Sequence, residues 1–349
     1  MKILYHGHLW SGSTARHRFE AFGRLPGVTA IPSDAGAELG RKPSLWSRIR
    51  WKLRWPMDVD GVNAKLLRDV QAHRPDVVFV DNSRTMARRT LREIKQICDP
   101  LLVFYSPDDI VAPHNLSWPL RWSFPDWDVF FTTKTFNVEE LRTRGVRNPV
   151  LVGNAFDPQM HRPMTPEEVG EDFERYDLVF VGTVEQDRMA SILKLAEAGF
   201  TVAVFGNPAS RRGAAWQGLK HPKILSGPHV SGLDYTRMLH RGKVALCFLR
   251  KMNRDQITTR SIECPAMARP MLAEKTAEHD SHFIDGEEYI GFSNDAEMIE
   301  KVRRLLADPK FRARVARQGF ARSISSGYST DSRAAQMMSA IKAGLNQRQ

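Results

Sequence analysis

Short runs of apolar residues alternate with segments of helical periodicity along most of the chain. Runs of this kind are typical of parallel strands that are buried on both faces. They form two sets, and we predict strands at 2–5, 77–80, 101–105 and 129–132, then at 178–181, 201–205, 223–225 and 244–249. Helices are predicted between them, at 15–25, 62–73, 86–98, 189–198 and 234–241, with a last helix from 331 to about 345. Repeated β-α units predict an α/β protein with two Rossmann-like, doubly wound parallel sheets.

Domain organisation follows from the same pattern. The chain of 349 residues is long enough for two domains with separate cores. The two strand sets predict a junction in the segment V-G-N-A-F-D-P-Q-M-H-R-P, residues 152–163. We therefore expect an N-terminal domain at 1–155, a C-terminal domain at 156–328 and a terminal helix within 329–349.

Cysteine usage and hydropathy indicate the compartment. Cys98, Cys247 and Cys264 are far apart and form no C-x-x-C pair, so we interpret them as small buried residues in a reducing compartment. The N-terminal residues M-K-I-L-Y-H-G-H lack the apolar core of a signal peptide. No apolar run approaches the ~20 residues that span a bilayer. These patterns predict a cytoplasmic protein.

The net charge of +11 favours anionic partners, namely nucleotide phosphates, anionic lipid or nucleic acid. Positive charge is most concentrated from Arg41 to Pro56, R-K-P-S-L-W-S-R-I-R-W-K-L-R-W-P, where Trp and aliphatic residues interleave with Arg and Lys. One interpretation is a helix lying on the inner face of the membrane. The other is a solvated helix that docks on its domain through Leu45, Ile49 and Leu53, which are spaced four residues apart.

The stretch D-Q-I-T-T-R-S-I-E-C-P-A-M-A-R-P-M-L, residues 255–272, places two acids on either side of a polar, cationic turn. Glu263 is predicted to open a helix with Pro265 in its first turn, and its carboxylate can accept two adjacent sugar hydroxyls. Just before it come residues expected where helix N-terminal N–H groups attract anions: Thr258, Thr259 and Arg260. This combination describes a nucleotide pocket. The alternative is a capped surface helix with an incidental acid.

Asp255 and Glu263 stand eight residues apart, and Glu263 leads A-M-A-R-P-M-L after two further residues. This pattern resembles the E-x7-E signature of retaining GT-B glycosyltransferases. The chain departs from it by an Asp at the first acid and by Ala268 in place of Gly. The resemblance implies that Glu263 binds the nucleotide ribose and that Asp255 contacts hydroxyls of the donor sugar. It also implies two domains facing each other across a cleft, with the 329–349 helix returning to the first domain.

The segment D-L-V-F-V-G-T-V-E-Q-D-R carries a second part of the resemblance. Gly182 and Thr183 follow a strand, where backbone can approach a ligand. Arg188 stands where these enzymes have the Lys of G-R-L-x-x-x-K-G, so the resemblance assigns it to the diphosphate. Thr183 replaces the Arg of that motif, and Arg260 is expected to supply the second cation. The alternative for Arg188 is a solvated position on a helix surface.

Two more loops follow strands of the second set, F-G-N-P-A-S and S-G-P-H-V-S. We assign Gly206 in the first loop to the donor site, and family analogy places His229 and Val230 of the second beside the nucleobase. Ordinary connecting loops are the alternative. No pattern in the chain resembles a metal site.

The N-terminal domain carries weaker patterns. H-G-H-L-W-S-G-S-T-A-R-H-R-F-E follows the first strand and offers donors to phosphate or sugar at Gly12, Ser13 and Thr14. It is not G-x-G-x-x-G, so no dinucleotide site is inferred. F-Y-S-P-D-D-I-V-A-P-H-N follows a later strand and offers a base or an acceptor-hydroxyl contact at Asp108, Asp109 and His114. A turn cap explains one of the acids equally well. D-N-S-R, residues 81–84, is a similar but less specific candidate.

Taken in order, G-S-T-A-R, S-P-D-D, V-G-T-x-x-x-x-R and T-x-R-S-I-E resemble the spore-maturation-protein-like glycosyltransferases, with a group 1, family 4-type C-terminal domain. The resemblance implies metal-independent transfer of a sugar, with retention, from a nucleoside-diphosphate donor, a UDP-sugar first, in polysaccharide or glycoconjugate biosynthesis. The acceptor is a hydroxyl of a glycan, a lipid-linked glycan or a protein. Two alternatives stay open: a nucleotide-sugar epimerase of the same fold, and a non-catalytic protein that binds nucleic acid or anionic lipid. Nucleic acid is not an obligatory partner.

Overall fold

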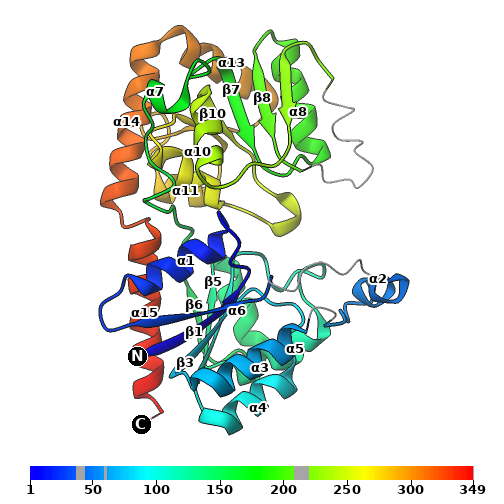
Figure 1. Ribbon diagram of the computed structural model, residues 1–349. Helices are drawn as coiled ribbons and strands as arrows, with labels where there is room; N and C mark the ends of the chain where they lie inside the picture. The colour runs from blue at the N-terminus through cyan, green and yellow to red at the C-terminus, as the bar shows by residue number, and fades with distance from the viewer. Residues whose placement is uncertain (37–43, 59–60, 208–219, 349) are drawn as a thin grey trace. The chain divides into compact units, whose positions relative to one another are not determined.

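The computed structural model describes residues 1–36, 44–58, 61–207 and 220–348. The chain forms two compact units. The N-terminal unit comprises residues 1–154 together with 330–349, and the C-terminal unit comprises residues 155–329. Each unit is described by itself (Figure 1).

The N-terminal unit is built on a six-stranded parallel sheet in the order β2-β1-β3-β4-β5-β6. Its strands are β1 (Lys2–Gly7), β2 (Thr29–Asp34), β3 (Val77–Asp81), β4 (Leu101–Ser106), β5 (Val129–Thr132) and β6 (Pro149–Leu151). Its helices are α1 (Thr14–Gly23), α2 (Leu45–Lys52), α3 (Val62–His73), α4 (Arg88–Cys98), α5 (Trp118–Ser123), the 3-10 turn η1 (Phe124–Asp126), α6 (Thr135–Thr143) and α15 (Thr330–Asn346).

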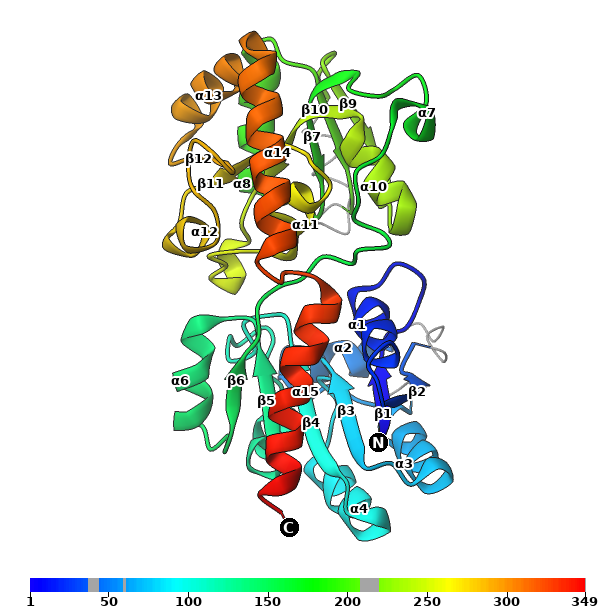
Figure 2. The ribbon, with the colours of Figure 1, turned by 90° about the vertical axis from the view of Figure 1, so that its left-hand side faces the viewer.

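Successive residues of these strands serve two different cores, because side chains alternate between the faces of a strand. Ile3 and Tyr5 pack in the core that α1 and α15 cover, while Leu4 packs in the core that α3, α4 and α5 cover. Figure 2 shows α15 running along one face of the sheet. Its Met337 and Ile341 are fully buried there, so this helix is part of the fold of the N-terminal unit.

The C-terminal unit repeats this plan in the order β12-β11-β10-β7-β8-β9. Its strands are β7 (Tyr176–Val181), β8 (Val202–Phe205), β9 (Ile224–Gly227), β10 (Gly242–Cys247), β11 (Met271–Glu274) and β12 (Ile290–Phe292). Its helices are α7 (Pro166–Val169), α8 (Gln186–Glu197), α10 (Gly232–His240), η2 (Lys251–Asn253), α11 (Thr259–Ala266), α12 (Ala277–His282), α13 (Asp295–Ala307) and α14 (Pro309–Ser325). One core joins the sheet to α8, α13 and α14, and the other joins it to α10 and α11.

The prediction of two Rossmann-like parallel α/β sheets is confirmed. Four strands were not predicted: β2, β6, β11 and β12. Three of these lie at sheet edges, where one neighbour is missing and the apolar run is short. Cys247 and Cys264 are buried as expected, whereas Cys98 is only partly so. Within the described residues, no helix has both the length and the apolarity needed to cross a bilayer.

The basic segment predicted from Arg41 to Pro56 is described from residue 44 onward, and residues 41–43 lie outside the described part. The expectation that Leu45, Ile49 and Leu53 dock on the domain is wrong. Leu45 and Leu53 are 72 and 64% exposed, and Ser47 is the residue of α2 that is buried. The four-residue spacing does place the three side chains on one face of the helix, but that face is turned to solvent.

Candidate functional site

Glu263 lies in the second turn of α11, which begins four residues earlier than the sequence predicted. Thr258 caps this helix and exchanges hydrogen bonds with Ser261 in a capping box. Ser261 is in turn bonded to the buried His279, whose other ring nitrogen donates to the Glu274 carbonyl. This network starts the helix at Thr259. The prediction that Pro265 occupies the first turn is therefore wrong, because the stronger cap lies upstream of it.

The Glu263 side chain is buried and held from two sides. The Tyr235 hydroxyl donates to Oε2 at 2.6 Å, and His161 Nε2 lies 3.6 Å from Oε1. The Asp157 N–H donates to His161 Nδ1, so the ring proton of a neutral His161 is on Nε2, facing the carboxylate. Burial and the neighbouring Glu263 raise the pKa of Tyr235 well above its usual value, so this hydroxyl stays a donor. Each carboxylate oxygen keeps a further acceptor position for a ligand hydroxyl.

Two arginines share one aromatic ring in the same unit. The guanidinium groups of Arg188, on α8, and Arg260, on α11, lie 5.8 and 5.0 Å from the ring centroid of Phe180. Arg188 is 5% exposed and donates from Nη1 to the Thr183 carbonyl at 2.8 Å. The alternative of a solvated Arg188 on a helix surface is therefore wrong. Burial and the charge of Arg260 lower the pKa of Arg188.

These two guanidinium groups retain unused hydrogen-bond donors. Nε of Arg188, and Nε and Nη1 of Arg260, are buried without a hydrogen-bond partner among the described residues. Buried polar groups in folded proteins are nearly always paired, and two cations that repel each other cost additional free energy. An anion that accepts from both side chains would satisfy these donors and offset the charge.

Glycines bring backbone close to the two arginines. A Cβ at position 182 would lie 2.3 Å from Arg260 Nη2, and a Cβ at position 206 would lie 1.8 Å from the Gly182 carbonyl oxygen. The ends of β7 and β8 therefore touch backbone to backbone, which no larger residue permits. The sequence analysis assigned both glycines to the donor site, and for Gly182 the reason was the approach of backbone to a ligand.

The remaining candidates of this unit follow other strands of the same sheet, whose carboxyl ends share one edge. Asp255 is partly exposed in the loop between η2 and α11. Thr258 is the N-cap of α11, and Thr259 and Arg260 begin that helix. Loop residues complete the set at this edge: Thr183 and His229, both exposed, and Val230, which is partly buried.

In the N-terminal unit, the structure separates the candidates into structural and accessible residues. Ser13 caps α1, accepting from the Arg16 N–H and donating to the His8 carbonyl, so its hydroxyl has a structural role in the helix cap, and its role as a ligand donor stays a prediction. Thr14 is exposed, and Gly12 has a φ of 85° in the preceding turn. Asp109 is fully buried and accepts from the Asn137 amide, which fits the turn-cap alternative. The accessible candidates are the partly exposed Asp108 and His114.

The sequence analysis missed several residues that the structure brings together. His161 and Tyr235 orient Glu263 from separate segments. In the N-terminal unit, Asp81 binds the buried Arg18 through a 2.8 Å ion pair and also accepts from the Tyr5 hydroxyl. Asp81 follows the strand predicted at 77–80 and was named only within the less specific candidate D-N-S-R; its partners Arg18 and Tyr5 were missed. Among the described residues, no group of three or more His, Cys, Asp or Glu side chains is arranged to hold a metal ion.

Comparisons with known proteins identify the architecture. The chain superposes on Anabaena HepE in complex with UDP with a TM-score of 0.67 and 12% identity, covering 98% of this chain and 100% of that one. For sucrose-phosphate synthase from Thermosynechococcus elongatus the TM-score is 0.68 and the identity 11%, covering 99% of this chain and 100% of the other. The fold is GT-B.

Two further comparisons define how far this likeness extends. Residues 183–339 of this GT-B chain match a family model described as glycosyl transferase-like. The UDP-GlcNAc 2-epimerase of Neisseria meningitidis, solved with UDP-GlcNAc, is also similar, with a TM-score of 0.58 and 10% identity over 98% of this chain and 100% of that one. No curated protein sequence matches the chain. The residues that match this family model include Arg188, Arg260 and Glu263.

Proposed function

We propose that this GT-B protein is a glycosyltransferase that moves a sugar from a nucleoside-diphosphate sugar to an acceptor hydroxyl. The donor binds in the C-terminal unit, at the carboxyl edge of its sheet. One observation carries the proposal: two arginines whose unused donors are buried lie on the same helix-and-loop framework as a carboxylate that is oriented by Tyr235 and His161. A diphosphate and a ribose diol are the chemical groups that match these two features.

Each residue then has a defined task. Glu263 accepts from the ribose hydroxyls, and Arg188 with Arg260 neutralises the diphosphate, which carries the growing charge as it leaves. Gly182, Thr183, Gly206, Thr258 and Thr259 line the phosphate path, and His229 with Val230 borders the nucleobase. Asp255 contacts the donor sugar. UDP-sugars are the first donors to test, since HepE has been solved with UDP and with UDP-glucose.

The stereochemical course and the metal requirement are further parts of the proposal. The spacing of Asp255 and Glu263 favours retention, and the order of G-S-T-A-R, S-P-D-D, V-G-T-x-x-x-x-R and T-x-R-S-I-E favours the spore-maturation-protein-like branch. Arginine side chains and helix N–H groups can stabilise a leaving diphosphate without a metal ion. If the product is inverted instead, Asp108 is the base to replace first, because Asp109 is fully buried and bonded to Asn137.

Replacement of Glu263 tests the ribose assignment. We expect Glu263→Gln to abolish transfer from a UDP-sugar and to weaken UDP binding in calorimetry, while the exposed Glu300→Gln, in the same unit, behaves like the wild type. The Gln keeps the size of the side chain but loses one acceptor and the charge. Wild-type UDP affinity in Glu263→Gln would remove the ribose assignment.

The Neisseria likeness makes an epimerase the second candidate. Incubating the donor with the protein and no acceptor separates the two functions. An epimerase yields an isomerised sugar nucleotide under these conditions, whereas a transferase leaves the sugar nucleotide intact or slowly hydrolyses it. Isomerised product that is lost in Glu263→Gln would replace the transferase proposal.

A further inference from the structure

The N-terminal unit carries a surface rich in exposed tryptophan, which we call the tryptophan surface. It consists of α2, the segment that follows it to Met57, and α5. Trp55 packs edge-on against Trp122 with ring centroids 4.9 Å apart, and the Arg54 guanidinium lies 4.9 Å from the Trp118 ring. These contacts join the two segments. The exposed large apolar side chains of this surface are Leu45, Trp46, Ile49, Trp51, Leu53, Trp55, Met57, Trp118 and Trp122.

The charge of this surface has one sign. Residues 44–57 contain four Arg or Lys residues and no Asp or Glu. Exposed apolar patches of this extent mark interaction sites, and interleaved Trp and Arg suit the headgroup layer of an anionic bilayer. Single-stranded nucleic acid would also use the cations and rings. Nucleic acid has no aliphatic part that Leu45 and Leu53 could contact, and these two are among the most exposed side chains of the surface. A lipid bilayer is therefore the better match.

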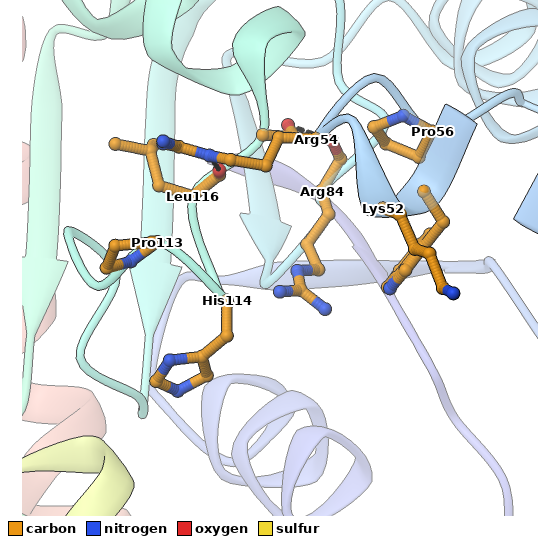
Figure 3. A pocket seen from close by; sticks show the side chains of 9 residues that line it. Lys52, Arg54, Pro56, Arg84, Pro113, His114 and Leu116 are labelled. Atoms are coloured by element: carbon orange, nitrogen blue, oxygen red, sulfur yellow. Dashed lines mark hydrogen bonds between the residues drawn. The ribbon is translucent and has the colours of Figure 1, made fainter. Parts of the chain in front are cut away.

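A cavity of about 220 Å³ opens beside the tryptophan surface, and we call it the cationic cavity. Figure 3 shows the side chains of Lys52, Arg84 and His114 extending into one open space. Arg84 Nε donates to the Asn115 carbonyl at 2.9 Å, which holds the side chain in place. The Trp51 ring lies 4.7 Å from the Arg84 guanidinium. No acidic side chain is among the residues that line this cavity. Its chemistry fits a phosphate group.

A second cavity, of about 200 Å³, shares Trp51 and Arg84 with the first, and we call it the polar cavity. Its wall includes side chains that recognise hydroxyl groups: Asp58, Asp81, Asn82, Ser83 and Thr85. His6 also lines it, is 1% exposed, and has no hydrogen-bond partner for Nε2 among the described residues. Ser33 donates to Asp69 and therefore accepts from His6 Nδ1, which leaves Nε2 of a neutral His6 as an unused acceptor.

The tryptophan surface, the cationic cavity and the polar cavity follow one another on the N-terminal unit. In this order they match the lipid chain, the phosphate and the sugar or polyol of a lipid-linked acceptor. We infer that the N-terminal unit docks on an anionic bilayer through the tryptophan surface and binds a lipid-linked acceptor there. The phosphate of this acceptor occupies the cationic cavity, and its sugar or polyol occupies the polar cavity. The acceptor role rests on the proposed transferase function, whereas docking and phosphate binding do not.

Vesicle sedimentation of the full-length protein tests the docking. We expect binding to phosphatidylcholine vesicles that contain phosphatidylglycerol, and little binding to phosphatidylcholine alone. Leu45→Ser/Leu53→Ser should weaken this binding about tenfold or more, because two aliphatic side chains no longer enter the bilayer. The matched control is Ile284→Ser/Ile324→Ser, which alters two exposed residues of the C-terminal unit and should leave binding unchanged. Equal sedimentation of the two double variants, or tighter binding to single-stranded DNA than to these vesicles, would overturn the inference.

Lipid and free phosphate are distinguished in the same assay. Lys52→Gln/His114→Gln should weaken binding to vesicles that contain phosphatidylinositol, which carries a phosphate and a polyol ring, whereas the exposed Lys342→Gln should not. Soluble glycerol phosphate should compete only weakly, because it lacks the lipid chain. Competition as strong as that of the lipid would show that the cationic cavity binds free phosphate and would overturn the lipid-linked acceptor. An unaffected Lys52→Gln/His114→Gln variant would refute the phosphate site itself. Glu263→Gln should bind vesicles normally, so a failed donor site and a failed docking surface give different results.

Discussion

Replacing Arg188 by Met separates a ligand-binding arginine from a structural one. Met keeps much of the length and apolar contact of the side chain but removes the charge and the donors. In the wild type, Arg188 makes one hydrogen bond to the Thr183 carbonyl and lies 3.7 Å from Glu185. We expect Arg188→Met to lose UDP affinity while the fold keeps its stability.

The expected magnitudes follow from the geometry. Both guanidinium carbons lie over Phe180, so they are at most about 11 Å apart, and like charges at that distance repel by about 1.5 kcal/mol at an effective dielectric constant of 20. The Arg188→Met substitution removes this repulsion and the free-energy cost of burying a charge. It also removes a charged hydrogen bond worth roughly 1.5–3 kcal/mol. The free energy of unfolding should therefore change by less than about 1.5 kcal/mol. Loss of a charged contact to the diphosphate should weaken UDP binding about 10- to 100-fold.

Calorimetric titration with UDP and urea unfolding measure the two effects. Arg269→Met is the matched control, since Arg269 is a largely buried arginine of the same unit that pairs with Glu174 at 2.9 Å. This control should lower the free energy of unfolding by about 2 kcal/mol, because it breaks a partly buried pair, and should leave UDP affinity unchanged. The reasoning fails if Arg188→Met destabilises the protein as Arg269→Met does while binding UDP normally.

Three further expectations follow from the structure. Tyr235→Phe removes the donor to Glu263 and should weaken UDP binding about three- to tenfold in calorimetry, with a smaller effect on 2′-deoxy-UDP; an equal effect on both nucleotides would argue against ribose binding. Gly206→Ala should lower the melting temperature by several degrees because its Cβ meets the Gly182 carbonyl, whereas Gly23→Ala, whose Cβ has room, should not. Burial lowers the pKa of His240 to about 4, so the free energy of unfolding should be highest above pH 6.5 and should fall by about 3 kcal/mol as the pH drops to 4. Urea unfolding across this pH range measures the effect, and His240→Gln should flatten the dependence.

Seven of the eight strands that the sequence predicted lie inside the described sheets, and the reason is burial; the eighth, β9, is an edge strand. β3 and β4 are buried along their whole length, so their apolar runs are continuous. β2, T-A-I-P-S-D, is an edge strand with a Pro at its centre and mostly partial burial, and its sequence resembles a loop. Edge strands depend on pairing with a neighbour more than on their own composition. Periodicity therefore predicted the architecture but missed three of the four edge strands of the described sheets and the short interior strand β11.

Prediction of the site was limited in a different way. Glu263 and Arg188 could be proposed because they stand in short motifs with a fixed spacing. Tyr235 and His161 could not, because each reaches Glu263 from a segment about 30 to 100 residues away in sequence, and only the fold brings them together. The start of α11 was misplaced for a related reason. The Thr258–Ser261 capping box is stabilised by His279, which no local pattern connects to it.

Two buried arginine sites within this chain show how structural and functional charge can be told apart. The charge of Arg18 is neutralised by an ion pair with Asp81, and its guanidinium lies 4.2 Å from the Tyr105 ring. Arg188 has a long 3.7 Å pair with Glu185, but buried donors of Arg188 and Arg260 lack a hydrogen-bond partner among the described residues, and the two cations repel each other over one ring. A fold retains such an arrangement only where something repays its free-energy cost, because mutation to a neutral residue would otherwise stabilise it. In our proposal a bound diphosphate does so, because it supplies two negative charges and several acceptors at once. It follows that UDP should raise the unfolding free energy of the wild type and should do so far less in Arg188→Met.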